Sequence, residues 1–370
     1  MNHFNRIIII VICMFGGIFL LCTSTSLAQP LESAKIPSLM SAVRVKGPMD
    51  FCGEKVPLQE AEVREDLEKE ILLSLWDRAQ VILWIKRSGR YMPHIEKMLK
   101  QYKMPDDLKY VAIVESALLP HIGSSKGAVG YWQFIPSTGR KYGLRIDKYI
   151  DERRNFFTAT RAAMSYFRKL YSDFGAWTLA VAAYNMGEHG LARRIDEQKT
   201  RDYYHLYLPL ETQRYIYKIL AVKLILSDLK KYGFHLTKDD IYHPVHFDRV
   251  KIDSPLAVPV QSIAEAAGTW FKTIKDMNPE IRGYSLVAGS HYIVIPKGKA
   301  AAFQNRLAAL MQKEAAAEAA RKEIVHVVRR GEFLSGIAEK YNVPVQDLLR
   351  WNKLPRNSTI HPGQRLVIKK

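Results

Sequence analysis

A single glutamate, Glu115, interrupts an otherwise apolar stretch at residues 110–119. Pro-Asp-Asp at 105–107 precedes the stretch and favours a helix start, because proline suits the first turn and carboxylates face the positive helix end. A helix that is apolar on all sides is buried, and Glu115 shares an inward stripe with Leu108 and Val111. A buried carboxylate without a partner normally takes up a proton.

A carboxylic acid that stays protonated near neutral pH is what glycosidic cleavage requires of its general acid. The alternative for Glu115 is a structural glutamate that reaches a helix end or pairs with a buried arginine. Both interpretations follow from the position of the residue alone, so the surrounding motifs have to separate them.

Four motifs follow Glu115 along the chain. They are residues 124–139 with Trp-Gln-Phe at their centre, Asp-Glu-Arg-Arg at 151–154, residues 182–187 with Ala-Tyr-Asn, and Glu-Thr-x-x-Tyr at 211–215. In this order they resemble the catalytic domain of lytic transglycosylases, in the goose-type lysozyme superfamily, over residues 56–235. Four motifs in the family's order are more specific than any one of them.

The resemblance implies a role for each matching residue. Glu115 matches the family's sole catalytic carboxylate, and the substrate-binding candidates are Ser116, Gln133, Tyr184, Asn185 and Tyr215. Ser116 and Tyr215 are expected to orient the carboxyl group, and the other three to hold sugar groups. Asn185 next to a glycine also fits ordinary turn chemistry, and Tyr215 also fits a packed aromatic. Tyr217 stands where the family usually has proline, which affects local geometry only.

Most glycosidases use two carboxylates, whereas the resemblance implies one. Glu115 would protonate the oxygen between N-acetylmuramic acid and N-acetylglucosamine, and then accept the proton of the sugar's own 6-hydroxyl as a 1,6-anhydro end forms. Two alternatives stay open: a hydrolytic lysozyme-type muramidase, and a peptidoglycan-binding scaffold without activity. The mass of the products distinguishes a hydrolytic muramidase from a lytic transglycosylase, and a turnover assay distinguishes an inactive scaffold from either enzyme.

Two short C-terminal segments are related by a constant offset of 74 residues. Ile-Ala-Glu at 263–265 repeats at 337–339, and Asn278 matches Asn352. Each copy is expected to form strand, helix, helix and strand. The second copy resembles a LysM module, which binds glycans containing N-acetylglucosamine, although Glu332 and Phe333 replace the usual Asp-Thr. The first copy lacks the glycine turn, so it is either a degenerate LysM-like module or a structural spacer.

These patterns together predict an α+β chain, with a mostly α-helical lysozyme-like catalytic domain followed by two small βααβ LysM-type modules. The expected segments are a signal peptide (1–28), a tether (29–60), the lysozyme-like domain (61–235), a degenerate LysM-like module (240–298), an Ala-rich helical spacer (299–323) and a LysM module (324–370).

The N-terminus predicts export. Arg6 precedes an apolar run at 7–21, and the small-residue site Ser-Leu-Ala at 26–28 follows, which is the pattern of a secretory signal peptide. An uncleaved membrane anchor is the alternative. Leu21 stands directly before Cys22, where lipoproteins need a small residue, so acylation is disfavoured. The expected location is the periplasm or cell envelope.

The composition fits an exported globular protein. Of 370 residues, 48% are apolar and 25% charged, and 55 basic against 37 acidic residues give a net charge of +18. Such an excess predicts an anionic partner, and export points to the peptidoglycan glycan strands of the wall, with peripheral association to membrane or wall, rather than to nucleic acid. Only Cys52 remains after the signal, so neither a disulfide nor a zinc site is expected, and no motif indicates a metal or another cofactor.

Overall fold

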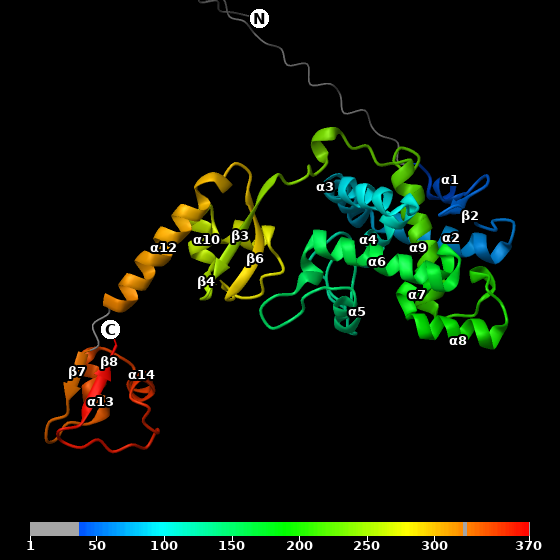
Figure 1. Cartoon of the computed structure of the whole chain (residues 1–370). Coiled ribbons are helices and arrows are strands. Elements are labelled where there is room, and N and C mark those ends of the chain that lie inside the picture. The colour runs from blue at the N-terminus through cyan, green and yellow to red at the C-terminus, as the bar shows by residue number, and fades with distance from the viewer. Residues whose placement is uncertain (1–36, 321–323, 370) are drawn as a thin grey trace, which may run out of the picture. The chain divides into compact units, whose positions relative to one another are not determined.

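The structure is a computed structural model that describes residues 37–320 and 324–369. The expected signal peptide and residues 29–36 of the expected tether lie outside the described residues. Within the described part of the chain, we find no helix with the length and apolar character needed to cross a membrane. The large helical part and the small strand-containing modules that follow it (Figure 1) confirm the predicted α+β fold class.

Helices build the first part of the described chain. They are α1 (Leu39–Val43), α2 (Ala61–Trp76), α3 (Arg78–Tyr102), α4 (Lys109–Ser116), α5 (Pro136–Lys141), α6 (Phe156–Phe174), α7 (Trp177–Met186), α8 (Glu188–Gln198) and α9 (Leu210–Ser227). A short antiparallel hairpin, β1 (Asp50–Phe51) and β2 (Glu54–Lys55), lies between α1 and α2 in the chain. Single 3-10 turns lie at Asp106–Leu108, Glu152–Arg154, Tyr203–His205 and Lys238–Asp240.

Local sequence sets both ends of α6. The Asn155 side-chain oxygen accepts the backbone N–H groups of Phe157 and Thr158, each at 3.1 Å. Such a cap satisfies donors that have no partner inside the helix. The helix ends at Gly175, whose φ of 70° is a left-handed conformation that glycine adopts without steric cost.

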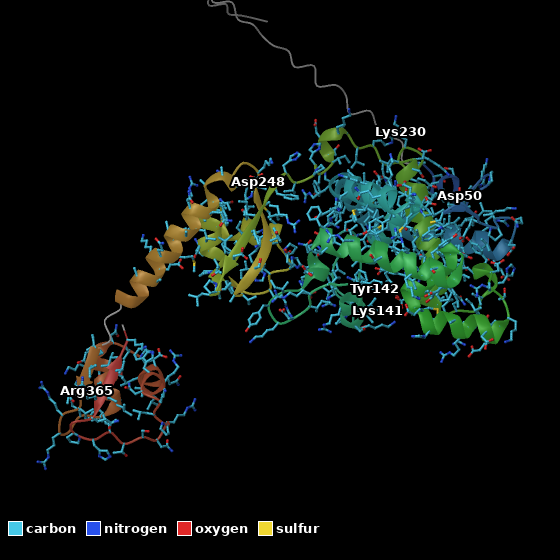
Figure 2. All side chains as sticks on the ribbon, in the orientation of Figure 1. Asp50, Lys141, Tyr142, Lys230, Asp248 and Arg365 are labelled. Carbon is cyan, nitrogen blue, oxygen red and sulfur yellow. The ribbon has the colours of Figure 1, made fainter. Side chains whose placement is uncertain are left out.

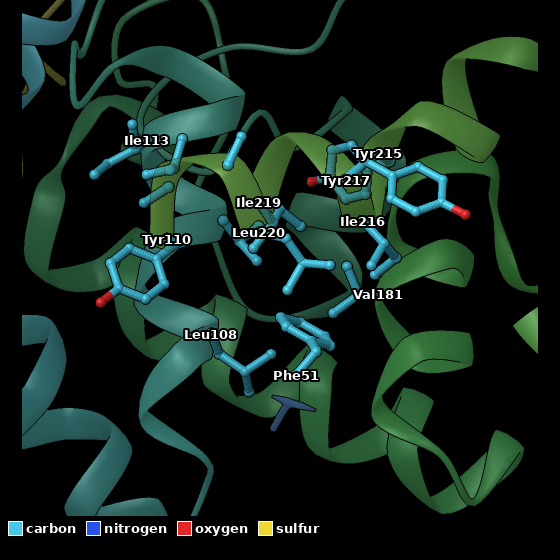
Figure 3. Packing of buried hydrophobic residues seen from close by; sticks show 14 of the residues in the cluster. Phe51, Leu108, Tyr110, Ile113, Val181, Tyr215, Ile216, Tyr217, Ile219 and Leu220 are labelled. Carbon is cyan, nitrogen blue, oxygen red and sulfur yellow. The ribbon is translucent and has the colours of Figure 1, made fainter. Parts of the chain in front are cut away.

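Helices α4 and α7 pack against α9. Figure 3 shows apolar side chains of these helices in one core cluster, and all of them are buried: Ile113, Val181, Ile216, Ile219 and Leu220. In α7, residues 180–183 are Ala-Val-Ala-Ala and are 0% exposed, so small side chains allow α6 and α9 to approach the helix closely. The middle of α7 is therefore buried on all sides, whereas Tyr184 and Asn185 at its C-terminal end are half-buried.

Residues 37–60 differ from the tether that the sequence suggested. Val43, Phe51 and Val56 are buried in the core of the helical domain. The Glu54 carboxylate accepts the backbone N–H of Trp177, and it accepts the backbone N–H and hydroxyl of Thr178 at 3.0 and 2.8 Å. This segment therefore caps α7 from outside. Its elements are too short to show a hydrophobic period, which is why the sequence did not reveal them.

The next part of the chain forms a βααβ module. Its elements are β3 (Phe247–Ser254), β4 (Val258–Pro259), α10 (Val260–Ala266), α11 (Phe271–Met277), β5 (Ser285–Leu286) and β6 (Gly289–Pro296), followed by α12 (Ala300–Ala320). Strands β3 and β6 pair antiparallel from Phe247 opposite Pro296 to Ser254 opposite Gly289. We call β3 to β6 together with the first turns of α12 the LysM-like module.

Helix α12 begins inside the LysM-like module. The carboxylate of Asp248, labelled in Figure 2, accepts the backbone N–H groups of Lys299 and Ala300 at 2.9 and 3.1 Å. Phe303 and Leu307 are buried in the module's core. The first turns of the expected Ala-rich spacer thus complete the packing of the module.

The C-terminal module has the same order of elements: β7 (Ile324–Val327), α13 (Leu334–Tyr341), α14 (Val345–Trp351) and β8 (Arg365–Ile368). Strands β7 and β8 pair antiparallel. Glu332, which replaces the usual residue of the LysM turn, accepts the backbone N–H of Arg329 and contacts the buried His326 ring, each at 2.7 Å. Glu332 therefore closes the turn, although it departs from the usual LysM sequence.

The two modules share an asparagine at the predicted offset, buried in the first module and half-buried in the second. The Asn278 amide donates to the Val294 carbonyl and accepts the Val294 N–H, both at 2.8 Å. Asn352 makes the same pair of bonds to Val367 at 2.8 and 2.7 Å. In each module one side chain ties the second helix to the last strand, which gives the sequence repeat a structural meaning.

Candidate active site

A cleft of about 610 Å³ opens beside the C-terminal ends of α4 and α7. Four of the sequence-predicted residues line it: Glu115, Gln133, Tyr184 and Asn185. The other two, Ser116 and Tyr215, are only 4% and 3% exposed. The structure thus divides the predicted site into residues that a ligand in the cleft can touch and residues behind them.

Glu115 is the penultimate residue of α4, which ends at Ala117 in a left-handed conformation. Burial of the side chain raises the pKa of the carboxyl to about 7 from an ordinary value of 4.5. The hydrogen bond from Tyr215 lowers the pKa and the nearby Glu211 carboxylate raises it, both by less than burial does. Near neutral pH the group is therefore divided between its acid and its carboxylate form.

The hydroxyl of Tyr215, on α9, donates a hydrogen bond to Glu115 Oε1. This bond persists when the carboxyl is ionised, because the phenol is the donor. Burial also raises the pKa of Tyr215 well above its ordinary value, so the phenol keeps its proton. A fixed donor on one oxygen orients the carboxyl and directs the other oxygen elsewhere. The neighbouring Tyr217 is buried within an unbroken α9, so the missing proline leaves the helix intact.

Gln133 lies in the loop between α4 and α5 and has a positive φ of 47°. Its side-chain nitrogen donates to the carbonyls of Ile122 at 3.0 Å and Gly130 at 2.9 Å. Because both amide protons have acceptors, the side chain is held in one orientation in the cleft wall. Its amide oxygen is then the group that can accept a hydrogen bond from a ligand.

Tyr184 and Asn185 lie at the C-terminal end of α7. The Tyr184 hydroxyl donates to the Trp132 carbonyl at 2.5 Å, and its ring stacks on Phe167 with centroids 4.7 Å apart. The Asn185 side-chain oxygen accepts the Thr212 hydroxyl at 2.8 Å, which turns the amide nitrogen toward other acceptors. Both residues thus join α7 to neighbouring segments of the cleft wall.

Ser116 has a different place from the one expected. Its hydroxyl lies 3.2 Å from the Ala112 carbonyl and 2.8 Å from the Tyr131 carbonyl. Ser116 is not among the described residues that line the cleft. The hydroxyl therefore ties the end of α4 to the loop that carries Gln133 and acts on the cleft through that loop.

Charged residues that the sequence reasoning did not select also line the cleft: Lys126, Arg193, Arg194 and Glu211. Lys126 and Glu211 form an ion pair at 3.7 Å, and Arg194 pairs with Glu197 at 3.0 Å. Glu211 stands in the Glu-Thr-x-x-Tyr motif and could have been found there, whereas the arginines carry no motif. The site therefore contains a second carboxylate, Glu211, at its exposed rim.

Comparisons with known proteins define the class of each part. Residues 92–207 match the Transglycosylase SLT domain, residues 246–312 match the LysM-like domain of lytic transglycosylase MltD, and residues 326–369 match the LysM domain. The chain thus carries an SLT transglycosylase domain, a LysM-like domain and a LysM domain. This confirms the resemblance that the motifs indicated.

Among curated relatives, membrane-bound lytic murein transglycosylase D of Escherichia coli K12 is 38% identical over 293 residues, and so is that of strain CFT073. The match covers 76% of this chain and 64% of each relative, so the chain spans less than two thirds of their length. Among solved structures, the 70 kDa soluble lytic transglycosylase SLT70 of Escherichia coli aligns at 18% identity with a TM-score of 0.33, over 48% of this chain and 33% of that one.

Proposed function

We propose that this protein is a lytic transglycosylase that cleaves the bond between N-acetylmuramic acid and N-acetylglucosamine in peptidoglycan. The observation that supports this most strongly is the Glu115 carboxyl, which lines the cleft, has a pKa raised to about 7 and accepts a hydrogen bond from Tyr215. Such a group can donate a proton and later take one back, which is general acid and then general base catalysis.

In the first step protonated Glu115 gives its proton to the glycosidic oxygen as the bond from that oxygen to the muramic acid C1 breaks. The bonding electrons leave with the oxygen, so a cation-like sugar remains. In the second step the sugar's own 6-hydroxyl oxygen attacks C1 and the Glu115 carboxylate accepts its proton. The product has a 1,6-anhydro end, no water is consumed, and Glu115 returns to its acid form.

The other residues of the site position the groups that react. Tyr215 keeps one Glu115 oxygen engaged, so that the same carboxyl is oriented in both steps. Gln133, Tyr184 and Asn185 line the cleft, where amide and aromatic groups suit the acetamido and hydroxyl groups of the glycan. Ser116 supports the loop that carries Gln133.

The proposal also covers where the protein acts and what each segment of the chain does. Residues 1–28 act as a signal peptide or, uncleaved, as an anchor, which places the enzyme in the periplasm or cell envelope. Residues 61–235 form the catalytic domain and residues 324–370 a LysM module that binds the glycan. The basic surplus of the chain, a net charge of +18, favours adsorption to the anionic wall in a salt-dependent way.

The test is the mass of the soluble products that residues 29–370 release from purified peptidoglycan. The proposal predicts muropeptides one water lighter than hydrolysis products, and none with Glu115→Gln. Reducing-end products would make the protein a lysozyme-type hydrolase, with Glu211 as the first candidate for a second carboxylate. Binding without any product from the unmodified protein would make it a scaffold.

A further inference from the structure

A catalytic-domain side chain is buried in the LysM-like module. Ile150 lies between α5 and α6, yet it packs in the apolar core of the module and is 5% exposed. It forms an isolated antiparallel bridge with Ile281, which is 1% exposed. Ile150 packs among residues of the module alone in this cluster, so the contact removes apolar surface that separate domains would leave open.

Hydrogen bonds accompany the apolar contact. The backbone N–H of Asp151 donates to the Glu280 carbonyl at 2.9 Å, and the N–H of Arg282 donates to the Tyr149 carbonyl at 2.8 Å. The Asn155 amide donates to Glu280 Oε1 at 2.9 Å. Residues 280–282 of the module therefore pair with residues 149–155 of the catalytic domain much as one strand pairs with another.

Residues 149–155 also hold the wall of the cleft. The Arg153 guanidinium donates to both Asp151 carboxylate oxygens at 2.8 Å, and the two side chains are 6% and 2% exposed. The same guanidinium donates to the carbonyls of Gly127 at 2.8 Å and Phe134 at 3.0 Å. A buried bidentate pair of this kind has a fixed geometry, so its place sets the place of those carbonyls.

The loop at 124–135 fits closely against this support. A Cβ at Gly130 would lie 1.9 Å from the Arg153 carbonyl oxygen, so only glycine allows the approach. Residues of this loop line the cleft, Gln133 and Phe134 among them. The contacts therefore run without a gap from Glu280 through Asp151 and Arg153 to the wall of the cleft.

We propose that the LysM-like module supports the cleft, with Glu280 and Ile281 acting as positioning residues that hold residues 149–155, whose Asp151 and Arg153 in turn hold the cleft loop at 124–135. The inference rests on the proposed function. A module that only adheres to the wall would matter for insoluble substrate alone, whereas a module that supports the cleft matters for any substrate.

The experiment uses the full chain and a short, soluble, uncrosslinked glycan of alternating N-acetylglucosamine and N-acetylmuramic acid. Ile281→Asp places a charge in the buried contact, and Glu280→Ala removes the acceptor of Asn155. Glu280→Gln is the matched control, because its amide oxygen can still accept that bond.

We expect Ile281→Asp to lower kcat about tenfold with a smaller change in KM, because small displacements of catalytic geometry cost rate more than affinity. Glu280→Ala should lower kcat about threefold, whereas Glu280→Gln should stay within about twofold of the unmodified chain. Thermal unfolding monitors the fold, and if Ile281→Asp does not fold, the Glu280→Ala and Glu280→Gln pair decides.

Unchanged kcat in the folded Ile281→Asp and Glu280→Ala variants would overturn the inference and leave the proposed function standing. Equal losses in Glu280→Ala and Glu280→Gln would also overturn it, because the hydrogen bond to Asn155 would then have no part in the effect. If the unmodified chain releases no product, the proposed function itself is wrong and the inference falls with it.

Discussion

Two glutamates of this protein have similarly raised pKa values in different surroundings. Glu115 lies in the cleft, and Glu280 lies in the contact between the catalytic domain and the LysM-like module. Burial raises the pKa of each carboxyl to about 7. Glu115 lines a cleft of about 610 Å³ and accepts a bond from a phenol. Glu280 is 6% exposed, accepts a bond from Asn155, and its second oxygen has no partner among the described residues.

The difference shows that a raised pKa reports burial and does not by itself indicate catalysis. Near neutral pH each carboxyl is divided between its acid and its carboxylate form. Glu280 also lines a cavity, of about 470 Å³, but only Glu115 accepts a bond from a phenol in the cleft that Gln133 and Asn185 also line. Burial of Glu280 favours its neutral form below about pH 7, and its bond from Asn155 suits a group that holds a contact.

The activity of the two glutamine variants should separate the two roles most strongly. Glu115→Gln removes the proton donor and should lower kcat about a thousandfold, since general acid–base catalysis contributes about 10²–10⁴-fold. Glu280→Gln keeps a neutral acceptor for Asn155 and should remain active. Initial rates of product release from a soluble glycan measure both, and equal losses would contradict the distinction.

Tyr215→Phe should lower kcat about tenfold, because the carboxyl of Glu115 loses the donor that orients it. The same bond favours the ionised form, so its loss raises the pKa of Glu115. The first step needs the protonated acid, so activity of the unmodified chain falls as pH rises through about 7. In Tyr215→Phe the fall of kcat with rising pH should therefore begin at a higher pH than in the unmodified chain. A pH–rate profile that does not move would show that Tyr215 leaves the carboxyl unaffected.

Stability should respond to pH in the same direction at both glutamates. The folded pKa of Glu280 is about 7 against an ordinary 4.5, so folding favours the protonated form. Below pH 4.5 the carboxyl is protonated in both the folded and the unfolded chain, so burying it has no electrostatic cost. Between about pH 4.5 and 7 the unfolded chain loses the proton and the folded chain keeps it, so the free energy of unfolding falls as pH rises.

Glu280→Gln should therefore raise the free energy of unfolding at about pH 8 by on the order of 2–3 kcal/mol, and change it little at about pH 4. Glu115→Gln should act in the same direction while abolishing activity. Denaturant unfolding at the two pH values measures the effect. A Glu280→Gln gain that is the same at both pH values would show that ionisation is not its cause.

Glu211→Gln should have the smallest effect, with kcat within about threefold of the unmodified chain. Glu211 lies at the exposed rim of the cleft, paired with Lys126, and a mechanism with one carboxylate gives it no proton to transfer. Loss of about a hundredfold or more, with reducing-end products, would instead assign it the second role of a two-carboxylate glycosidase.

The sequence revealed the parts of this molecule that repeat or that break a pattern. Glu115 was found because it is the single charge in an apolar stretch, and the asparagines at 278 and 352 because they recur at a fixed offset. Helix and strand classes followed from periodicity, so the α+β architecture could be predicted before the structure was known.

Contacts between distant segments were not visible in the same way. Glu54 caps α7 from a segment that was expected to be a tether, and Glu280 lies in a loop without any motif. The hydroxyl of Ser116 turns away from the carboxyl beside it because α4 ends there and the Tyr131 carbonyl lies within 2.8 Å. These features depend on how the chain folds back on itself, which local spacing does not encode.

The most direct test is a carbon NMR titration of the glutamate carboxyl groups, with Glu115→Gln and Glu280→Gln used to assign the two signals. We predict that both titrate near pH 7, and that the midpoint for Glu115 coincides with the pH at which kcat falls. A Glu115 signal that titrates near the ordinary value of 4.5 would contradict the account, because the carboxyl would then hold no proton to donate at neutral pH.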